Sequence, residues 1–291
     1  MEWLQKIATE NNFPNIALLE KSIRAFSLLE SLALSGCPFV FKGGTALMLH
    51  LDSAKRLSID IDIICPPNTN IEEYLYKNAD IYGFSEIKLI ERKTDHNVPC
   101  VADLLGDKLT AFAPNTTGIT YYKGNKMCSM EIIKQLYDIA SLFEITNDLT
   151  IVSNTFRNFA VVELAYRNLN PNDIGRVLDD IFQTSLCVCM QGKIDNEHFK
   201  LLQDGIKRIQ SFINSERYTL DSAIINASKV AYLSTLIANN LTEVEHFDKK
   251  KIVDMQNITI EYPLPTKLNK LKKNNIEAFY YWVKVFEIVK K

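Results

Sequence analysis

The 291-residue chain contains no run of about twenty apolar residues, so its sequence predicts no membrane-spanning helix. Its first fifteen residues include acidic side chains and no long apolar core, so no signal peptide is indicated and we expect a cytoplasmic protein. The formal net charge is only −2, which excludes a strong overall basic field of the kind that attracts nucleic acid. Any contact with a polyanion must therefore depend on a local basic patch.

The six cysteines and four histidines are scattered along the chain, and neither residue type forms a metal-binding pattern. Cys187 and Cys189 lie two positions apart, but no second pair lies near them, so a zinc site is not indicated. Buried free thiols in a reducing compartment are the expected state of the cysteines.

One stretch, residues 38–65, combines several patterns that are typical of a binding site. Within it, residues 57–63 alternate strictly between apolar and polar side chains, which is typical of a half-buried strand. The alternation places Asp60 and Asp62 on one face, about two strand rises (~6.6 Å) apart. Two such carboxylates supply the oxygen ligands that Mg²⁺ prefers. An Asp-x-Asp pair also occurs on exposed strands without any metal, although like charges on one face repel each other.

A glycine turn lies upstream of this strand, between an apolar run at 39–41 and a helix-like run at 46–51. Glycines let the backbone approach a ligand closely, and the N–H groups at a helix start favour anions, although many glycines simply mark turns. Arg56, just before the strand, could add a bidentate contact to phosphate. The sequence therefore predicts a site for a nucleotide triphosphate. Its predicted nucleotide-binding residues are Lys42, Gly43, Gly44, Thr45, Arg56 and Ser58; the alternative for Lys42 is that it simply ends a strand.

The motifs K-G-G-T-A-L at 42–47 and R-L-S-I-D-I-D at 56–62 together resemble the first motif of the AbiEii/AbiGii toxin family of nucleotidyltransferases. This family belongs to the DNA polymerase β-like superfamily. The resemblance is strongest over residues 42–64, continues more weakly to about residue 142 and fades beyond it. It implies a metal-dependent enzyme in which Asp60 and Asp62 hold Mg²⁺ or Mn²⁺. A third carboxylate is usual in the superfamily; Glu91 is the best-placed candidate, and Asp95 and Glu86 are others.

The resemblance also implies a function and partners. The enzyme would transfer a nucleoside monophosphate from an NTP to an acceptor, namely RNA such as the acceptor end of tRNA. It would act as the toxin of a type IV toxin–antitoxin or abortive-infection system, with a cognate antitoxin. Two alternatives stay open. One is a small-molecule nucleotidyltransferase of the antibiotic-modifying kind, and the other is a non-catalytic nucleotide-binding module on the same fold.

Two further residues match the family by position. In the family, a helix that carries a lysine is followed by a helix that carries an aspartate, and Lys108 and Asp138 match these positions. The resemblance implies that Lys108 contacts the nucleotide phosphates and that Asp138 supports the site. Taken without the resemblance, Lys108 is typical of a solvated helix lysine, and Asp138 could form a surface ion pair with Lys134 four positions earlier.

Helical and strand patterns predict an α+β fold. We expect an N-terminal nucleotidyltransferase-like domain, residues 1–148, in which helices flank a mixed sheet, and a C-terminal helical bundle, residues 149–291. In the first domain a further strand is predicted at 85–91. The predicted helices cover residues 3–10, 14–35, 71–79, 102–113, 130–144, 150–169, 173–190, 196–214, 219–240 and 275–289.

Lysines cluster near the C-terminus, at 249–251 and again at Lys267, Lys270, Lys272 and Lys273, just before the aromatic group 279–282. Basic residues interleaved with aromatics can bind single-stranded nucleic acid. The alternative is a solvated loop followed by an amphipathic helix whose aromatic side chains belong to the core. The pattern favours this second interpretation.

Overall fold

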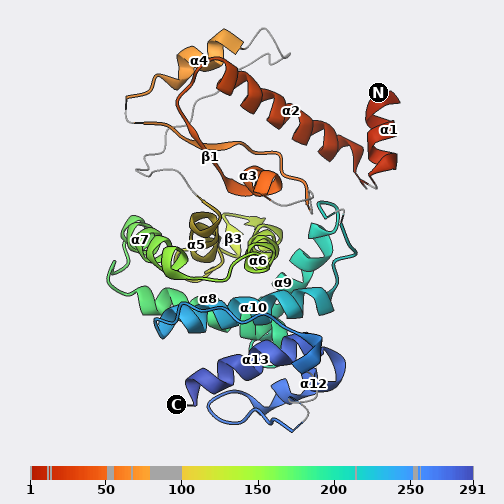
Figure 1. Cartoon of the computed structure of the whole chain (residues 1–291), viewed down its shortest axis with the longest axis vertical. Coiled ribbons are helices and arrows are strands. Elements are labelled where there is room, and N and C mark those ends of the chain that lie inside the picture. Colours follow the sequence, from red (N-terminus) through yellow and green to blue (C-terminus); the bar gives the residue numbers. More distant parts are fainter. Residues whose placement is uncertain are drawn as a thin grey trace. The chain divides into compact units, whose positions relative to one another are not determined.

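The computed structural model describes residues 2–11, 13, 15–50, 56–66, 68–78, 100–213, 215–251, 255 and 257–290. It is rich in helix and contains two small antiparallel sheets, in agreement with the predicted α+β class. The chain divides into two compact units, and Figure 1 labels most of their helices. Unit 1 contains Met1–Cys100 and Gln210–Arg217, and unit 2 contains Val101–Ile209 and Tyr218–Lys291.

The helices and strands of unit 1 follow the sequence patterns closely. The second helix begins after Asn15, whose side chain accepts a hydrogen bond from the Leu18 N–H at 3.0 Å and so caps the helix. It ends where the Gly36 N–H donates to the Ala33 carbonyl. The elements are α1 (Glu2–Glu10), α2 (Ile16–Leu34), β1 (Val40–Lys42), α3 (Gly43–His50), β2 (Asp62–Ile64) and α4 (Ile71–Asn78). The predicted helices at 3–10, 14–35 and 71–79 are thereby confirmed.

The core of unit 1 joins α1 and α2 to the residues that follow α3. Leu18, Leu19 and Leu57 are buried together, and Phe212 packs against them from a segment much later in the chain. Leu57 also donates its backbone N–H to the Phe212 carbonyl at 2.8 Å, and Arg56 forms an isolated antiparallel bridge with Ile213. A segment distant in sequence thus completes this core.

The strand predicted over 57–63 is shorter than expected. In the antiparallel pair of β1 and β2, Val40 lies opposite Ile64 and Lys42 lies opposite Asp62. The ladder ends there because α3 begins at Gly43, so β1 has no further residues to pair. The described residues of unit 1 contain only this antiparallel pair and not the predicted mixed sheet, and the strand predicted at 85–91 lies outside them.

Unit 2 is built mainly from helices. α5 packs against α6 and α7, α6 packs against α9 and α10, and α10 packs against α8 and α13. The predicted helices at 102–113, 130–144, 150–169, 173–190, 219–240 and 275–289 are confirmed to within a few residues at their ends, whereas the helix predicted over 196–214 ends five residues early, at Ile209. The elements are α5 (Val101–Ala111), β3 (Tyr122–Lys123), β4 (Lys126–Met127), α6 (Ser129–Phe143), α7 (Thr150–Tyr166), α8 (Ile174–Cys189), α9 (Asn196–Ile209), α10 (Leu220–Ala238), η1 (Lys249–Lys251), η2 (Thr266–Lys270), α12 (Leu271–Asn274) and α13 (Ile276–Val289).

Aromatic side chains fill the core of unit 2. Phe143 packs edge-to-face against Tyr281, and Phe182 packs edge-to-face against Trp282. All four aromatics at 279–282 are buried, so their predicted place in the core is confirmed. None of the described helices is both long and apolar enough to cross a membrane.

The compact units separate at 100/101 and around the segment 210–217. The sequence instead predicts a functional domain that continues to residue 148 and therefore includes α5 and α6. Both of these helices pack within unit 2. The division into compact units does not show where the predicted nucleotidyltransferase-like domain ends, so the boundary at 148/149 stays a prediction.

Candidate functional site

The start of α3 is the centre of the candidate site. β1 ends at Lys42, and Gly43 follows with a φ of +80°, a conformation that glycine adopts without strain. A Cβ atom added to Gly43 would lie 1.9 Å from Asp62 Oδ2, and one added to Gly44 would lie 2.7 Å from Arg56 Nη2. The two glycines therefore leave space for a carboxylate and a guanidinium to lie directly against the start of the helix.

Hydroxyl side chains fix the neighbouring chain in place. Thr45 is fully buried, and its hydroxyl donates a hydrogen bond to the backbone carbonyl of Asp60. Ser22 in α2 donates to the Ser58 carbonyl at 2.8 Å, and Ser58 Oγ lies 3.0 Å from the position of a Cβ on Gly44. Thr45 is thus engaged with the protein through its side chain, so its contribution to an anion site would come from its backbone N–H.

The two predicted metal-binding carboxylates are exposed. Asp60 and Asp62 alternate with the half-buried Ile59, Ile61 and Ile63, as the alternation in the sequence predicts. Exposed carboxylates beside a glycine turn fit a hard cation that takes part of its oxygen shell from substrate phosphates. The described residues contain no group of three acidic, histidine or cysteine side chains that could hold a metal ion.

The structure does not test the third metal-binding carboxylate that the family resemblance implies. Glu91 lies outside the described residues, as do Asp95 and Glu86. Its assignment as a metal ligand therefore stays a prediction.

Arg56 and Lys42 bring positive charge to the same place. Arg56 is buried, with only 6% of its surface exposed, and its Nη1 donates to the Leu57 carbonyl at 3.0 Å. Lys42 lies directly across the strand pair from Asp62. Unit 1 thus brings together all six predicted nucleotide-binding residues and both described carboxylates within one strand pair, one helix start and the chain beside them.

Lys108 and Asp138 form a buried ion pair within unit 2. Lys108 Nζ in α5 lies 3.0 Å from Asp138 Oδ2 in α6, and their side chains are 8% and 0% exposed. The alternative that Lys108 is a solvated lysine is therefore wrong, and so is a surface location for Asp138. The reason is that α5, α9 and α10 all pack against α6, so this helix buries more than the single stripe that its sequence predicts.

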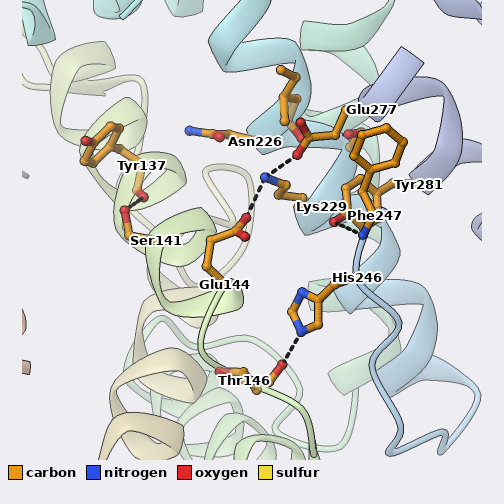
Figure 2. Close-up of polar contacts among 12 residues, drawn as sticks. Tyr137, Ser141, Glu144, Thr146, Asn226, Lys229, His246, Phe247, Glu277 and Tyr281 are labelled. Atoms are coloured by element: carbon orange, nitrogen blue, oxygen red, sulfur yellow. Dashed lines mark hydrogen bonds and ion pairs between the residues drawn. The ribbon is translucent and has the colours of Figure 1, made fainter. Parts of the chain in front are cut away.

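A second buried lysine was not identified from the sequence. Figure 2 shows Lys229 of α10 between two carboxylates, with Nζ 2.6 Å from Glu144 Oε1 and 2.7 Å from Glu277 Oε1. The ammonium group also lies 5.8 Å from the centroid of the Tyr281 ring. Glu144 follows α6 and Glu277 lies in the first turn of α13, so Lys229 links three helices. A single lysine in an otherwise apolar stretch of α10 is the signal that could have indicated it.

Asp180 of α8 is a buried carboxylate that holds a loop. It accepts hydrogen bonds from the Asn115 backbone N–H at 2.8 Å, from the Asn115 side-chain amide at 2.7 Å and from the Thr116 hydroxyl at 2.8 Å. These bonds fix the turn that follows α5. All of the donors are protein groups, so the role of Asp180 is structural.

Three buried cysteines, Cys37, Cys187 and Cys189, are not activated as nucleophiles. Burial raises the pKa of Cys37 to about 11, with a further contribution from the neighbouring Cys65. Burial also raises the pKa of Cys187 to about 12 and that of Cys189 to about 12. These thiols are protonated at neutral pH, and the thiolate is the form that attacks electrophiles or binds metals.

Comparison with curated proteins gives no match, and comparison with solved structures gives none either. A family model does match part of the chain. It covers residues 27–86, which include the glycine turn at 43–44 and both carboxylates, Asp60 and Asp62. The resemblance that the motifs indicate is confirmed over these residues, which match the family described as nucleotidyl transferase AbiEii toxin of a type IV toxin–antitoxin system.

Proposed function

We propose that this protein is a metal-dependent nucleotidyltransferase that transfers a nucleoside monophosphate from an NTP to an acceptor. The observation that carries the proposal is the close packing at the start of α3. Gly43 and Gly44 have no side chains there, so Asp62 and Arg56 lie directly against the helix start. Phosphate binding and cation binding are thereby combined in one place. The match to the nucleotidyl transferase family over residues 27–86 supports the same reaction.

In this reaction the acceptor oxygen forms a bond to the α-phosphorus, the bond from that phosphorus to the bridging oxygen breaks, and pyrophosphate leaves. Asp60 and Asp62 would hold Mg²⁺ or Mn²⁺. A bound divalent cation supplies positive charge that polarises the phosphate oxygens. Backbone N–H groups at the start of α3 would bind the phosphate tail, because the first N–H groups of a helix have no partner within it.

Basic side chains have separate roles in the proposal. Arg56 would donate two hydrogen bonds to a phosphate, a geometry that suits a guanidinium better than an ammonium group. Lys42 would add charge next to Asp62. Lys108 would contact the nucleotide phosphates and Asp138 would orient it, as the family resemblance implies.

For the acceptor we propose RNA, such as the acceptor end of tRNA, and for the biological role a toxin of a toxin–antitoxin or phage-defence system. The family description names a toxin of such a system, which supports a cognate antitoxin as a partner. A toxin that modifies RNA needs a surface for this polyanion as well as a nucleotide site.

The test is incubation of the purified protein with tRNA and an NTP labelled at the α-phosphate, with Mg²⁺ present. We expect label on the RNA, and we expect a label at the γ-phosphate to leave as pyrophosphate. Asp62→Asn should abolish transfer because it removes a metal-binding charge and keeps the side-chain shape. Asp179→Asn, at an exposed position in α8, is the matched control and should transfer normally.

Other outcomes would replace the proposal. Label on aminoglycosides alone would establish a small-molecule nucleotidyltransferase. NTP binding without transfer to any acceptor would establish a binding module. Full transfer by Asp62→Asn would show that the site lies elsewhere in the protein.

A further inference from the structure

Positive charge is concentrated in one short segment of unit 2. Residues 249–273 contain seven lysines and two acidic residues, whereas the whole chain has a net charge of −2. Such a local excess creates an attractive potential for polyanions that the average charge of the protein does not reveal.

Three of these lysines form a row. Lys267 and Lys270 of η2 and Lys273 of α12 are all exposed and recur every three residues. A 3₁₀-helix has three residues per turn and rises ~2 Å per residue, so Lys267 and Lys270 lie on one face about 6 Å apart. Leu268 and Leu271 are buried on the other side. We call Lys267, Lys270 and Lys273 the lysine row.

The lysine row is not neutralised by the protein. Among the residues that the structure describes, no carboxylate forms an ion pair with Lys267, Lys270 or Lys273. Lys272 differs from its neighbours because its Nζ donates to the Ile258 carbonyl at 3.0 Å and lies 5.5 Å from the centroid of the Phe279 ring. Within the described part of the chain, the three ammonium groups of the lysine row make no such contact and are exposed to solvent.

An exposed aromatic ring lies in the loop that leads to the row. Tyr262 is 90% exposed, in contrast to the buried aromatics at 279–282. The loop is closed by Asn269, which accepts from the Ile260 N–H at 2.8 Å and donates to the Ile260 carbonyl at 2.7 Å. A turn in which the Leu264 N–H donates to the Glu261 carbonyl at 3.0 Å holds the segment that contains Tyr262.

This closure keeps Tyr262 close to the lysine row. Tyr262 follows Ile260 by two residues, and Lys270 follows Asn269 directly. Two residues span at most about 7 Å of chain, so Tyr262 and Lys270 both lie near the contact between Ile260 and Asn269. The arrangement presents three ammonium groups and one stacking surface on a single segment with fixed ends.

This combination fits one partner best. Single-stranded nucleic acid needs cations along its backbone and aromatic faces for its unstacked bases, and each stacked base contributes substantially to affinity. A membrane surface would instead need apolar side chains beside the lysines, and here the leucines that accompany the row are buried in the core.

We propose that the lysine row and Tyr262 form a contact surface for single-stranded RNA, with phosphates along the row and one base stacked on the tyrosine. The choice of RNA over DNA rests on the proposed function, because RNA is the acceptor proposed there. The surface itself rests only on the exposure and charge of the residues in this segment.

The test measures binding of a short, fluorescein-labelled single-stranded RNA to the full chain by anisotropy, over a series of salt concentrations and without NTP. Each phosphate contact to a single strand contributes about −0.7 to the slope of log K against log salt. The triple variant Lys267→Ala, Lys270→Ala, Lys273→Ala should therefore bind more weakly, with a slope that is smaller in magnitude by about 2.

A matched control removes the same charge from elsewhere in unit 2. Lys193, Lys200 and Lys207 are also exposed, and their triple replacement by alanine should leave the salt slope unchanged. Tyr262→Ala should weaken binding about 5- to 150-fold at an unchanged salt slope, and Tyr262→Phe should bind normally because it keeps the ring. Circular dichroism spectra check that the variants are folded.

Three results would overturn the inference. One is an equal loss of RNA binding in the two triple variants, and another is unchanged binding by Tyr262→Ala. The third is row-dependent binding to phosphatidylserine vesicles without binding to RNA.

The transfer assay keeps this inference separate from the proposed function. Suppose that the unsubstituted protein transfers no nucleotide, but that it binds RNA through the lysine row and Asp62→Asn binds RNA in the same way. This result would contradict only the proposed function. Suppose instead that the protein transfers a nucleotide to RNA, but that its RNA binding does not depend on the lysine row. This result would contradict only the inference about the lysine row.

Discussion

Truncation of Lys108 should destabilise unit 2 strongly. Its ammonium group lies 3.0 Å from the fully buried carboxylate of Asp138. Lys108→Ala removes the cation and leaves the carboxylate away from water, a change that typically costs 3–5 kcal/mol. Unit 2 contains roughly 180 residues. For a domain of that size each kcal/mol lowers the melting temperature by about 2–4 °C, so we expect a decrease of about 6–20 °C.

Tryptophan fluorescence can follow this unfolding. Trp282 is fully buried in unit 2, and the second tryptophan, Trp3, is 61% exposed and belongs to unit 1. A Trp3→Phe background therefore limits the signal to unit 2 in case the two units unfold separately. Urea titration at neutral pH then compares the free energy of unfolding of Lys108→Ala with that of the background protein.

A double variant distinguishes the charge from the packing. Replacement of a buried ion pair by apolar side chains of similar size is often neutral or stabilising, so Lys108→Met with Asp138→Leu should recover most of the loss seen in Lys108→Met alone. The recovered protein then tests catalysis, because it should fold yet lose nucleotide transfer if Lys108 contacts the phosphates. The reasoning would be refuted if the urea midpoint of Lys108→Ala equalled that of the Trp3→Phe background protein.

Two further predictions follow from local geometry. Gly43→Ala should cost about 1–3 kcal/mol, because alanine is strained at positive φ and its Cβ would displace Asp62, and NTP binding should also weaken. Gly175→Ala, in α8, meets no atom within 4 Å, so it should leave NTP binding unchanged and should not lower thermal stability. The Asp195 carboxylate accepts from the His198 backbone N–H at 3.0 Å and caps α9, and this bond, together with the His198 ring, holds its pKa below the ordinary 3.8. Because the pKa of Asp195 is lower in the folded than in the unfolded protein, its ionised carboxylate stabilises the fold above pH 3.8. This stabilisation is lost as the pH falls below 3.8 and through the folded pKa. Asp195→Ala should therefore lose about 1 kcal/mol above pH 5, and thermal melts should show the difference from the unsubstituted protein shrinking in acid.

The features that depend on local sequence could be predicted. The alternation of residues 57–63 predicts the exposure of Asp60 and Asp62, and the glycines at 43–44 mark the change from strand to helix, although α3 begins at Gly43 itself and not at the predicted residue 46. Both patterns reflect constraints within a few residues, namely the two-residue period of extended chain and the conformational freedom of glycine. The sequence therefore identifies the members of the candidate site and their order.

Features that depend on distant segments could not be predicted. Periodicity describes one helix at a time, whereas the burial of Asp138 results from three other helices packing against α6. The same holds for Lys229, whose two carboxylate partners lie 85 and 48 positions away. A charged side chain in an apolar stretch indicates a partner, but the pattern does not name it.

The C-terminal segment shows the same limit in another form. The sequence groups its lysines with the aromatics at 279–282, which belong to the core. The exposed ring is Tyr262, in a loop that has no periodicity to mark it. Likewise, the helix predicted over 196–214 ends at Ile209, because residues 212 and 213 instead pair with the chain at Leu57 and Arg56.

This late pairing sets an order of assembly during synthesis. Phe212 follows Leu57 by 155 positions. At a synthesis rate of about 5–20 residues per second, it is added about 8–30 s later. For that time the chain at Leu57 lacks the segment with which it pairs in the folded protein, although the site residues of unit 1 up to Asp62 are complete soon after Leu57 is added. A chain that stops before Gln210 therefore contains these residues without the segment that pairs with Arg56.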